Sequence, residues 1–299
     1  MSNTPTIMAS FFRWIVTHPK RIILAGLIIM IGLGSFLPSL EKDTRSDAFL
    51  ADDNPALLYR DQVKDIFGLS DPIVIAVVAD TGADAGDSIF TIKGLNTIQE
   101  ITNTVLRLAN VDPQGVTSLA SENNIYGTED GMEVEPFYEG VIRSQSQADK
   151  VRDAIRNFPL YQGTLVSNDE TASLIVAEIL DESLVEETYQ SILASLEDLE
   201  LPEGIKLYVA GEGAIAGYLG SYIDSDAKRL NPLAAVVITI IILIAFRSLT
   251  ATLLANVIVA ASALTTLGAM SASGVPFFVI TNALPVILIG IAVADSIHI

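Results

Sequence analysis

An uncharged apolar segment lies close to the start of the chain. Ile22–Leu40 is a run of 19 residues bounded by Lys20, Arg21 and Glu41. At about 1.5 Å per residue, a helix of this length spans about 28 Å, which is near the thickness of a bilayer core. The run is longer than the apolar region of a cleaved signal peptide, and no clear small-x-small cleavage site follows it. The pattern therefore predicts an uncleaved transmembrane helix at residues 22–40.

Residues 1–21 precede this helix and mix aromatic with basic side chains. The relevant residues are Phe11, Phe12, Arg13 and Trp14, followed by Lys20 and Arg21. Such a mixture is typical of an interfacial helix at a membrane surface, with a disordered tail as the alternative. The basic residues predict a cytoplasmic N-terminus by the positive-inside rule, so the segment that follows the helix is expected outside.

A second apolar region occupies the end of the chain. Ser248–Ala294 is a stretch of 47 residues without one charged side chain. Proline and glycine at Gly274–Pro276 disfavour a continued helix. We therefore expect transmembrane helices at residues 230–246, 249–271 and 277–299, the last of them truncated. Buried helices of a soluble protein are the alternative, and the length of the uncharged stretch argues against them.

Residues 41–226 alternate between strand and helix patterns. Short β-branched runs predict strands at Pro72–Ala79, Val116–Ala120 and Ile205–Ala210, and apolar spacing predicts helices at Ser88–Ala109, Ser144–Asn157 and Ser183–Leu199. Ser167–Glu170 is expected to form the turn of a hairpin. The order β-α-β occurs twice, which predicts two small α+β units, each with helices on one face of its sheet. Residues 121–142 are expected to form an exposed loop.

Charge is segregated in the same way as hydropathy. The net charge is −19, and the mean hydropathy is +0.47. Of the 36 acidic residues, 35 lie between Glu41 and Asp226, together with 11 basic ones. Such a surface makes nucleic acid an unfavourable partner. There are no cysteines, which excludes disulfides and thiolate metal sites.

Motif searches favour no cofactor and no metal. The stretch GEGAIAG, Gly211–Gly217, is rich in glycine, but its spacing fits neither the Walker nor the Rossmann pattern. No acidic loop has the ligand spacing of an EF-hand. We read the acidic residues as a solvated surface.

One carboxylate, Asp295, interrupts the apolar end of the chain. An ionised aspartate in a membrane helix costs roughly 2.5–3.5 kcal/mol, so it is expected to face protein or water. Burial favours its protonated form, and a change of surroundings would let it take up and release a proton. A helix that starts near Val279 places Asp295 about 24 Å along its axis. His298, three residues later, is either a second proton-relay residue or a headgroup contact.

Other polar residues lie within the predicted transmembrane helices. We consider Asn256, Thr281, Asn282 and Ser296 as possible lining of a proton path. Hydrogen bonds between neighbouring helices are the alternative role for such side chains.

Three stretches carry a family resemblance. They are LVSNDETASLIVAEI, VAGEGAIAGYLGSYIDSDAKRLNPLAA and GVPFFVITNALPVILIGIAVADSIHI. Their order resembles the resistance-nodulation-division (RND) superfamily of permeases, in its lipid-exporter, MMPL and Patched-like branch. The resemblance implies an α-helical membrane protein with an α+β extracytoplasmic domain made of two ferredoxin-like βαβ porter subdomains.

The resemblance also implies a function. It points to a secondary active transporter, not an enzyme, that uses the proton-motive force to export hydrophobic or amphipathic molecules, lipids above all. The location would be the inner membrane of a bacterium, with the large domain in the periplasm. Membrane lipids, a lipid or hydrophobic cargo and a homo-oligomeric partner are the expected contacts, without a cofactor.

Two departures from the family pattern change the picture. The family arrangement G-x-x-x-D-D-x-x-H matches Gly290, Asp295 and His298, but Ala294 stands in the first acidic position. The family also has two similar halves, so we read this chain as an N-terminal fragment that lacks its C-terminal half. A membrane-anchored envelope binding or assembly subunit, or a protein-export relative, are the alternative functions.

Overall fold

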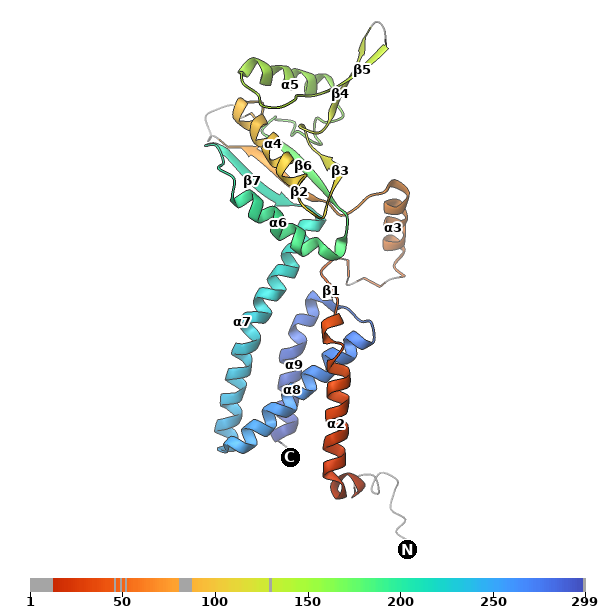
Figure 1. Ribbon diagram of the computed structural model, residues 1–299, viewed down its shortest axis with the longest axis vertical. Coiled ribbons are helices and arrows are strands. Elements are labelled where there is room, and N and C mark those ends of the chain that lie inside the picture. The colour runs from red at the N-terminus through yellow and green to blue at the C-terminus, as the bar shows by residue number, and fades with distance from the viewer. Residues whose placement is uncertain are drawn as a thin grey trace. The chain divides into compact units, whose positions relative to one another are not determined.

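The computed structural model describes residues 13–45, 47–48, 50–51, 53–80, 88–128 and 131–297. The chain forms two compact units. The first, which we call the helical unit, consists of Met1–Asp43 and Tyr222–Ile299, and the second, the α/β unit, of Thr44–Ser221. Figure 1 labels the elements of both.

The helical unit is built from long apolar helices. Its elements are α2 Pro19–Gly34, η1 Leu37–Ser39, β1 Lys42–Asp43, α7 Glu212–Phe246, α8 Leu249–Ala272, β8 Phe277–Phe278, η3 Val279–Ala283 and α9 Leu284–Ile297. The stretches Pro19–Ser39, Glu212–Phe246 and Leu249–Ala272 are long and apolar enough to cross a membrane. No residue of α2 is buried, and large apolar side chains on all three stretches are exposed. Surfaces of this kind suit contact with acyl chains.

Two boundaries in this unit differ from the sequence prediction. Helix α7 begins at Glu212, 18 residues before the predicted start at Leu230, and its first residues belong to the α/β unit. The last helix begins at Leu284 instead of Phe277, because Phe277–Phe278 is an extended strand and Val279–Ala283 a 3-10 turn. The Thr281 hydroxyl accepts the backbone N–H of Phe278 at 3.2 Å, which stabilises this turn. The position of these helices in a bilayer stays a prediction.

A short parallel strand pair, which we call the strap, links the end of α2 to the segment before α9. Lys42 pairs with Phe277 and Asp43 with Phe278, and the Phe277 N–H donates to the Glu41 carbonyl at 2.8 Å. The strap therefore fixes backbone segments that lie more than 230 residues apart in sequence.

Helices α2 and α8 pack against each other, and α8 also packs against α9. At Gly268 of α8, a Cβ atom would lie only 2.5 Å from the Leu33 carbonyl carbon of α2. The Ser271 hydroxyl donates to the Phe36 carbonyl at 2.7 Å. Small residues that permit close backbone approach, with hydroxyl hydrogen bonds beside them, are typical of packed membrane helices.

The α/β unit contains one four-stranded antiparallel sheet. Its strands are β2 Ile73–Ala79, β3 Val111–Thr117, β6 Ala172–Ile179 and β7 Ile205–Ala210, in the spatial order β3-β6-β2-β7. Helix α4, Ile92–Val105, connects β2 to β3, and helix α6, Val185–Glu197, connects β6 to β7. The sequence predicts two separate βαβ units. Among the described residues the two units instead share this sheet, because β6 inserts between β2 and β3.

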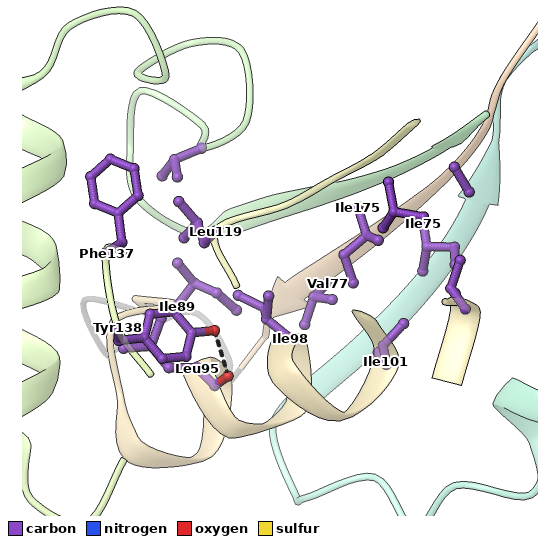
Figure 2. Packing of buried hydrophobic residues seen from close by; sticks show 14 of the residues in the cluster. Ile75, Val77, Ile89, Leu95, Ile98, Ile101, Leu119, Phe137, Tyr138 and Ile175 are labelled. Carbon is purple, nitrogen blue, oxygen red and sulfur yellow. Dashed lines mark hydrogen bonds between the residues drawn. The ribbon is translucent and has the colours of Figure 1, made fainter. Parts of the chain in front are cut away.

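The core of this unit lies between the sheet and α4. In β2 and β6 alternate residues are buried, so one face of the sheet is apolar. Ile75 and Ile175 lie opposite each other in the sheet and are fully buried, as are Ile98 and Ile101 of α4 (Figure 2). Burial of each such side chain stabilises the fold by roughly 1.5–3 kcal/mol.

The α/β unit contains further elements. They are α3 Pro55–Phe67, β4 Asn123–Thr128, β5 Gly131–Pro136, α5 Gln145–Asn157 and η2 Glu182–Leu184. Of the exposed loop expected at residues 121–142, the exposure is confirmed for the strands β4 and β5, but the absence of regular structure is wrong. Asn123–Pro136 is a β-hairpin apart from its tip, and Tyr138 is buried, with its hydroxyl donating to the Leu95 carbonyl at 3.0 Å. The β-branched signal there is weak, since few residues of the hairpin are β-branched.

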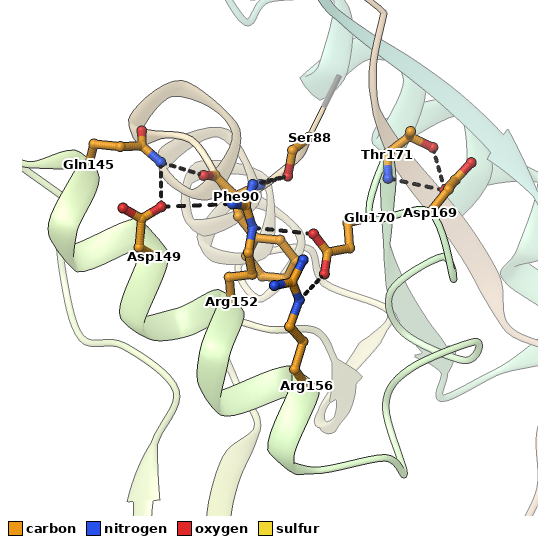
Figure 3. A network of polar contacts seen from close by, with 9 residues as sticks. All are labelled: Ser88, Phe90, Gln145, Asp149, Arg152, Arg156, Asp169, Glu170 and Thr171. Atoms are coloured by element: carbon orange, nitrogen blue, oxygen red, sulfur yellow. Dashed lines mark hydrogen bonds and ion pairs between the residues drawn. The ribbon is translucent and has the colours of Figure 1, made fainter. Parts of the chain in front are cut away.

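A polar network joins α5 to the turn before β6 (Figure 3). Arg152 lies 3.2 Å from a Glu170 carboxylate oxygen, donates to the Ser88 hydroxyl at 2.7 Å and sits 5.7 Å from the centre of the Phe90 ring. Arg156 contacts the other Glu170 oxygen at 2.5 Å. Glu170 has φ 60°, as expected in a tight turn, so the predicted turn at Ser167–Glu170 is confirmed.

Candidate functional site

The helical unit contains a cavity of about 550 Å³ between α7 and the segment η3–α9. Its volume lies in the range of small-molecule binding sites. Ten residues line it: Asp226, Ala227, Leu230, Asn231, Val279, Ile280, Asn282, Ala283, Val286 and Ile287. Seven of these side chains are apolar and three are polar, which is the composition expected of a site for an amphipathic molecule.

The wall formed by α7 follows from helical spacing. Asp226, Ala227, Leu230 and Asn231 are at positions i, i+1, i+4 and i+5, so they share one face. Pro232 follows directly inside the helix. A proline at this position lacks the N–H that would bond the carbonyl four residues earlier, which loosens α7 beside the cavity.

The opposite wall is the start of the last helix. Because residues 279–283 form a 3-10 turn before α9, their side chains stack with a period of three residues. Val279 and Asn282 are three residues apart and both line the cavity. The irregular turn thus places one amide among apolar side chains.

Charge at the cavity comes from Asp226. This carboxylate is half-buried, and it has no ion-pair or hydrogen-bond partner among the described residues. Asp224, two residues earlier, is paired with Lys42 of the strap at 2.5 Å. Lys228 and Arg229 are exposed and lie about 130° from the centre of the lining face, although Arg229, at position i+3, is about 60° from Asp226 itself. The cavity therefore carries a net negative charge.

The polar residues that the sequence offers as lining of a proton path do not lie together in the structure. Asn282 lines the cavity, whereas Thr281 bonds locally within the turn. Asn256 of α8 accepts the Thr239 hydroxyl of α7 at 3.1 Å and donates to the Thr252 carbonyl at 3.0 Å. This contact between α7 and α8 is of the kind that the alternative interpretation expects, and the lining of a proton path by Asn256 stays a prediction. The side chain of Ser296 lies outside the described part of the structure.

Asp295 belongs to α9, eleven residues after its start at Leu284. This is about 17 Å along the helix axis, less than the 24 Å that a start at Val279 predicts. Its side chain is not described, and His298 lies outside the described residues. Their role as proton-relay residues stays a prediction.

The glycine-rich stretch is explained by packing. Gly211 has φ +100°, and a Cβ atom there would lie 2.5 Å from the Pro72 carbonyl oxygen. A Cβ atom on Gly217 would lie 2.8 Å from Cγ of Tyr189 on α6. Close approach of backbone elements is a sufficient reason for glycine at both positions. In the described residues no group of three potential ligands could hold a metal ion.

Sequence reasoning missed Asp226 and Asn231. Asp226 lies before the predicted start of the second membrane helix at residue 230, and Asn231 is the second residue of that predicted helix. Extending the periodicity back through Pro232 would have placed them on the Leu230 face of α7.

The sequence profile described as the MMPL family matches residues 93–296, from the start of α4 to the end of α9. The chain belongs to the MMPL family. The family resemblance within the RND superfamily is thereby confirmed, and with it the chain's character as a membrane protein of a transport family.

The chain is also similar to two curated proteins. The chain is 20% identical to a putative membrane protein, MJ1562, of Methanocaldococcus jannaschii over 284 residues, covering 94% of this chain and 70% of that protein. It is 30% identical to the probable transport protein MmpL9 of Mycobacterium tuberculosis over 117 residues, covering 38% of this chain and 12% of that protein. The cavity walls and Asp295 lie within the region that matches the family.

Proposed function

We propose that this MMPL protein takes part in proton-driven export of hydrophobic or amphipathic molecules, lipids above all, across a bacterial inner membrane. The observation that carries the proposal is the cavity at the start of α9, with its seven apolar and three polar side chains. A molecule with an apolar tail and a polar head matches this lining in both parts.

Coupling to protons is assigned to α9. Ile287 lines the cavity, and Asp295 follows eight residues later on the same helix, about 12 Å along its axis. Because a protonated aspartate tolerates an apolar environment far better than an ionised one, loss of the proton would change the packing of α9. A change in α9 alters one wall of the cavity, which would link proton transfer to cargo release.

The α/β unit is proposed as a periplasmic porter domain. The described residues contain one sheet of split βαβ topology, which supports this proposal. Helix α7 contributes residues to both units, so a movement of this domain reaches the cavity wall directly. A second copy of the chain is proposed to complete the pathway.

The test is transport by the full-length protein in vesicles. A dansyl-labelled lipid is loaded on one side, a pH gradient is imposed, and appearance of the probe on the other side is followed by fluorescence. Asp295→Asn removes the titratable group with little change in size and is expected to abolish the gradient-dependent part of transport. Ile291→Val, which changes an exposed apolar side chain of the same helix, is the control and is expected to transport normally. Full gradient-dependent transport by Asp295→Asn would refute the proton role.

A further inference from the structure

We infer that the cavity selects amphipathic molecules whose head group is a protonated amine. The inference rests on the proposed function for the identity of the site, and it adds the chemical class of the head group. It commits to one occupant, a cationic amphiphile, over neutral and anionic ones.

The first argument is charge. Asp226 is the charged member of the lining, and no described residue neutralises it. Lys228 and Arg229 lie away from the centre of the lining face. Arg229 is at position i+3 from Asp226 on the same helix, but it forms no ion pair with Asp226 among the described residues. An ammonium group placed in the cavity would form a charge-assisted hydrogen bond with the carboxylate, while an anionic head group would be repelled.

The second argument is the remaining polar lining. Asn231 and Asn282 come from opposite walls, and each offers an amide oxygen as acceptor. An ammonium group has three donors and no acceptor. One carboxylate and two amide oxygens match these three donors in number.

The third argument is the apolar remainder. The other seven lining residues are alanine or larger aliphatic side chains, and none of them bears a polar atom in its side chain. A wholly polar cation, such as an inorganic ion, would make no apolar contact with these side chains. The occupant therefore needs an apolar tail in addition to its amine.

The experiment measures equilibrium binding to the purified full-length chain in nanodiscs of zwitterionic lipid. Three probes share one dansyl-labelled alkyl chain and end in a primary amine, a hydroxyl or a carboxylate. The wild-type chain is expected to bind the amine at least tenfold more tightly than the carboxylate, with the alcohol between them. Parallel titrations of empty nanodiscs give the contribution of the lipid.

Variants assign the preference to the cavity. Asp226→Asn is expected to reduce amine affinity at least tenfold and to leave the alcohol within twofold. Asp226→Glu retains the charge and is expected to retain the preference. Ala283→Phe fills the cavity and is expected to weaken all three probes. Asp224→Asn removes a neighbouring carboxylate that does not line the cavity and is expected to change nothing.

Three results would overturn the inference. They are equal wild-type affinity for amine and carboxylate, an amine preference that survives in a folded Asp226→Asn protein, and undiminished binding by Ala283→Phe. Folding of each variant is checked by circular dichroism. Because binding is measured without a pH gradient, Asp295→Asn should bind the amine normally, so failure of proton-driven transport and failure of amine selection are separate results.

Discussion

The crossing of α2 and α8 gives a sharp prediction, because a single methyl group should disturb it. A Cβ atom on Gly268 would lie 2.5 Å from the Leu33 carbonyl carbon and 3.0 Å from the Gly34 nitrogen. Non-bonded carbon atoms prefer 3.5–4.0 Å. Gly268→Ala therefore requires the two helices to separate by about 1 Å, and the neighbour is backbone, which has no alternative rotamer.

The expected cost follows from this overlap. Overpacking of a close contact destabilises a protein by about 1–3 kcal/mol, and the higher helix propensity of alanine offsets up to about 1 kcal/mol of it. Gly32→Ala on α2 is the matched control, because a Cβ atom there has no neighbour within 4 Å. Gly268→Ala should thus unfold more readily than Gly32→Ala in thermal melts of the purified chain in detergent, followed by far-UV circular dichroism. Equal stability of the two variants would refute the close crossing.

The chain lacks cysteine, which permits a second readout by disulfide formation. Lys42 and Phe277 are partners in the strap, and adjacent strands lie about 4.7–4.9 Å apart, within the Cα separation that a disulfide accepts. The double variant Lys42→Cys/Phe277→Cys should cross-link rapidly, and Gly268→Ala in this background should slow the reaction. Lys42→Cys/Phe278→Cys is the control, since successive strand residues point to opposite faces.

Two further predictions concern the α/β unit. The Ile89 N–H donates to the Glu170 carbonyl at 2.8 Å, and Arg152→Ala should greatly increase the hydrogen-exchange rate of this N–H. Arg156 is more exposed, so Arg156→Ala should change the exchange rate of the Ile89 N–H little. Equal effects of the two variants would contradict the network. Hydrogen bonds from the Ser167 hydroxyl and from Thr171 lower the pKa of Asp169 to about 2. Its contribution to stability is therefore present above the unfolded pKa near 4 and is lost as pH falls towards 2. Asp169→Asn should flatten that part of the stability–pH curve, and an unchanged slope between pH 4 and pH 2 would contradict the assignment.

Local signals in the sequence predict most of the elements but not their partners. The capping box of α5 is readable because Ser144 and Gln147 are three residues apart, and the structure contains both of its hydrogen bonds. The strands β2 and β7 are found within one residue of the predicted bounds. Which strands pair is a matter of contacts distant in sequence, so the insertion of β6 between β2 and β3 has no local signature.

For the candidate site, too, local features are predicted from the sequence and contacts between distant segments are not. Hydropathy identifies the apolar helices, and the break at Gly274–Pro276 correctly separates α8 from the segment that follows. Hydropathy does not predict the cavity, because the cavity forms where η3 lies opposite a face of α7 that is about 50 residues earlier in the chain. Asp226, the charged residue of that face, is the last of 35 acidic residues between Glu41 and Asp226, so nothing in the sequence distinguishes it from the others.

Under the proposed function, the two walls of the cavity should differ in how easily they move, because they are attached differently to the rest of the helical unit. On the side of α9, the wall is anchored through the backbone hydrogen bonds of the strap and the turn at Thr281. On the side of α7, one link to the strap is the exposed ion pair of Lys42 with Asp224, and exposed pairs of this kind contribute about 0–1 kcal/mol. Pro232 weakens the same helix just after the lining residues. Of the two walls, α7 therefore has the lower cost of displacement, and it is the wall that carries the Asp226 carboxylate. A shift of α7 would therefore change both the shape of the cavity around a bound molecule and the position of the Asp226 carboxylate.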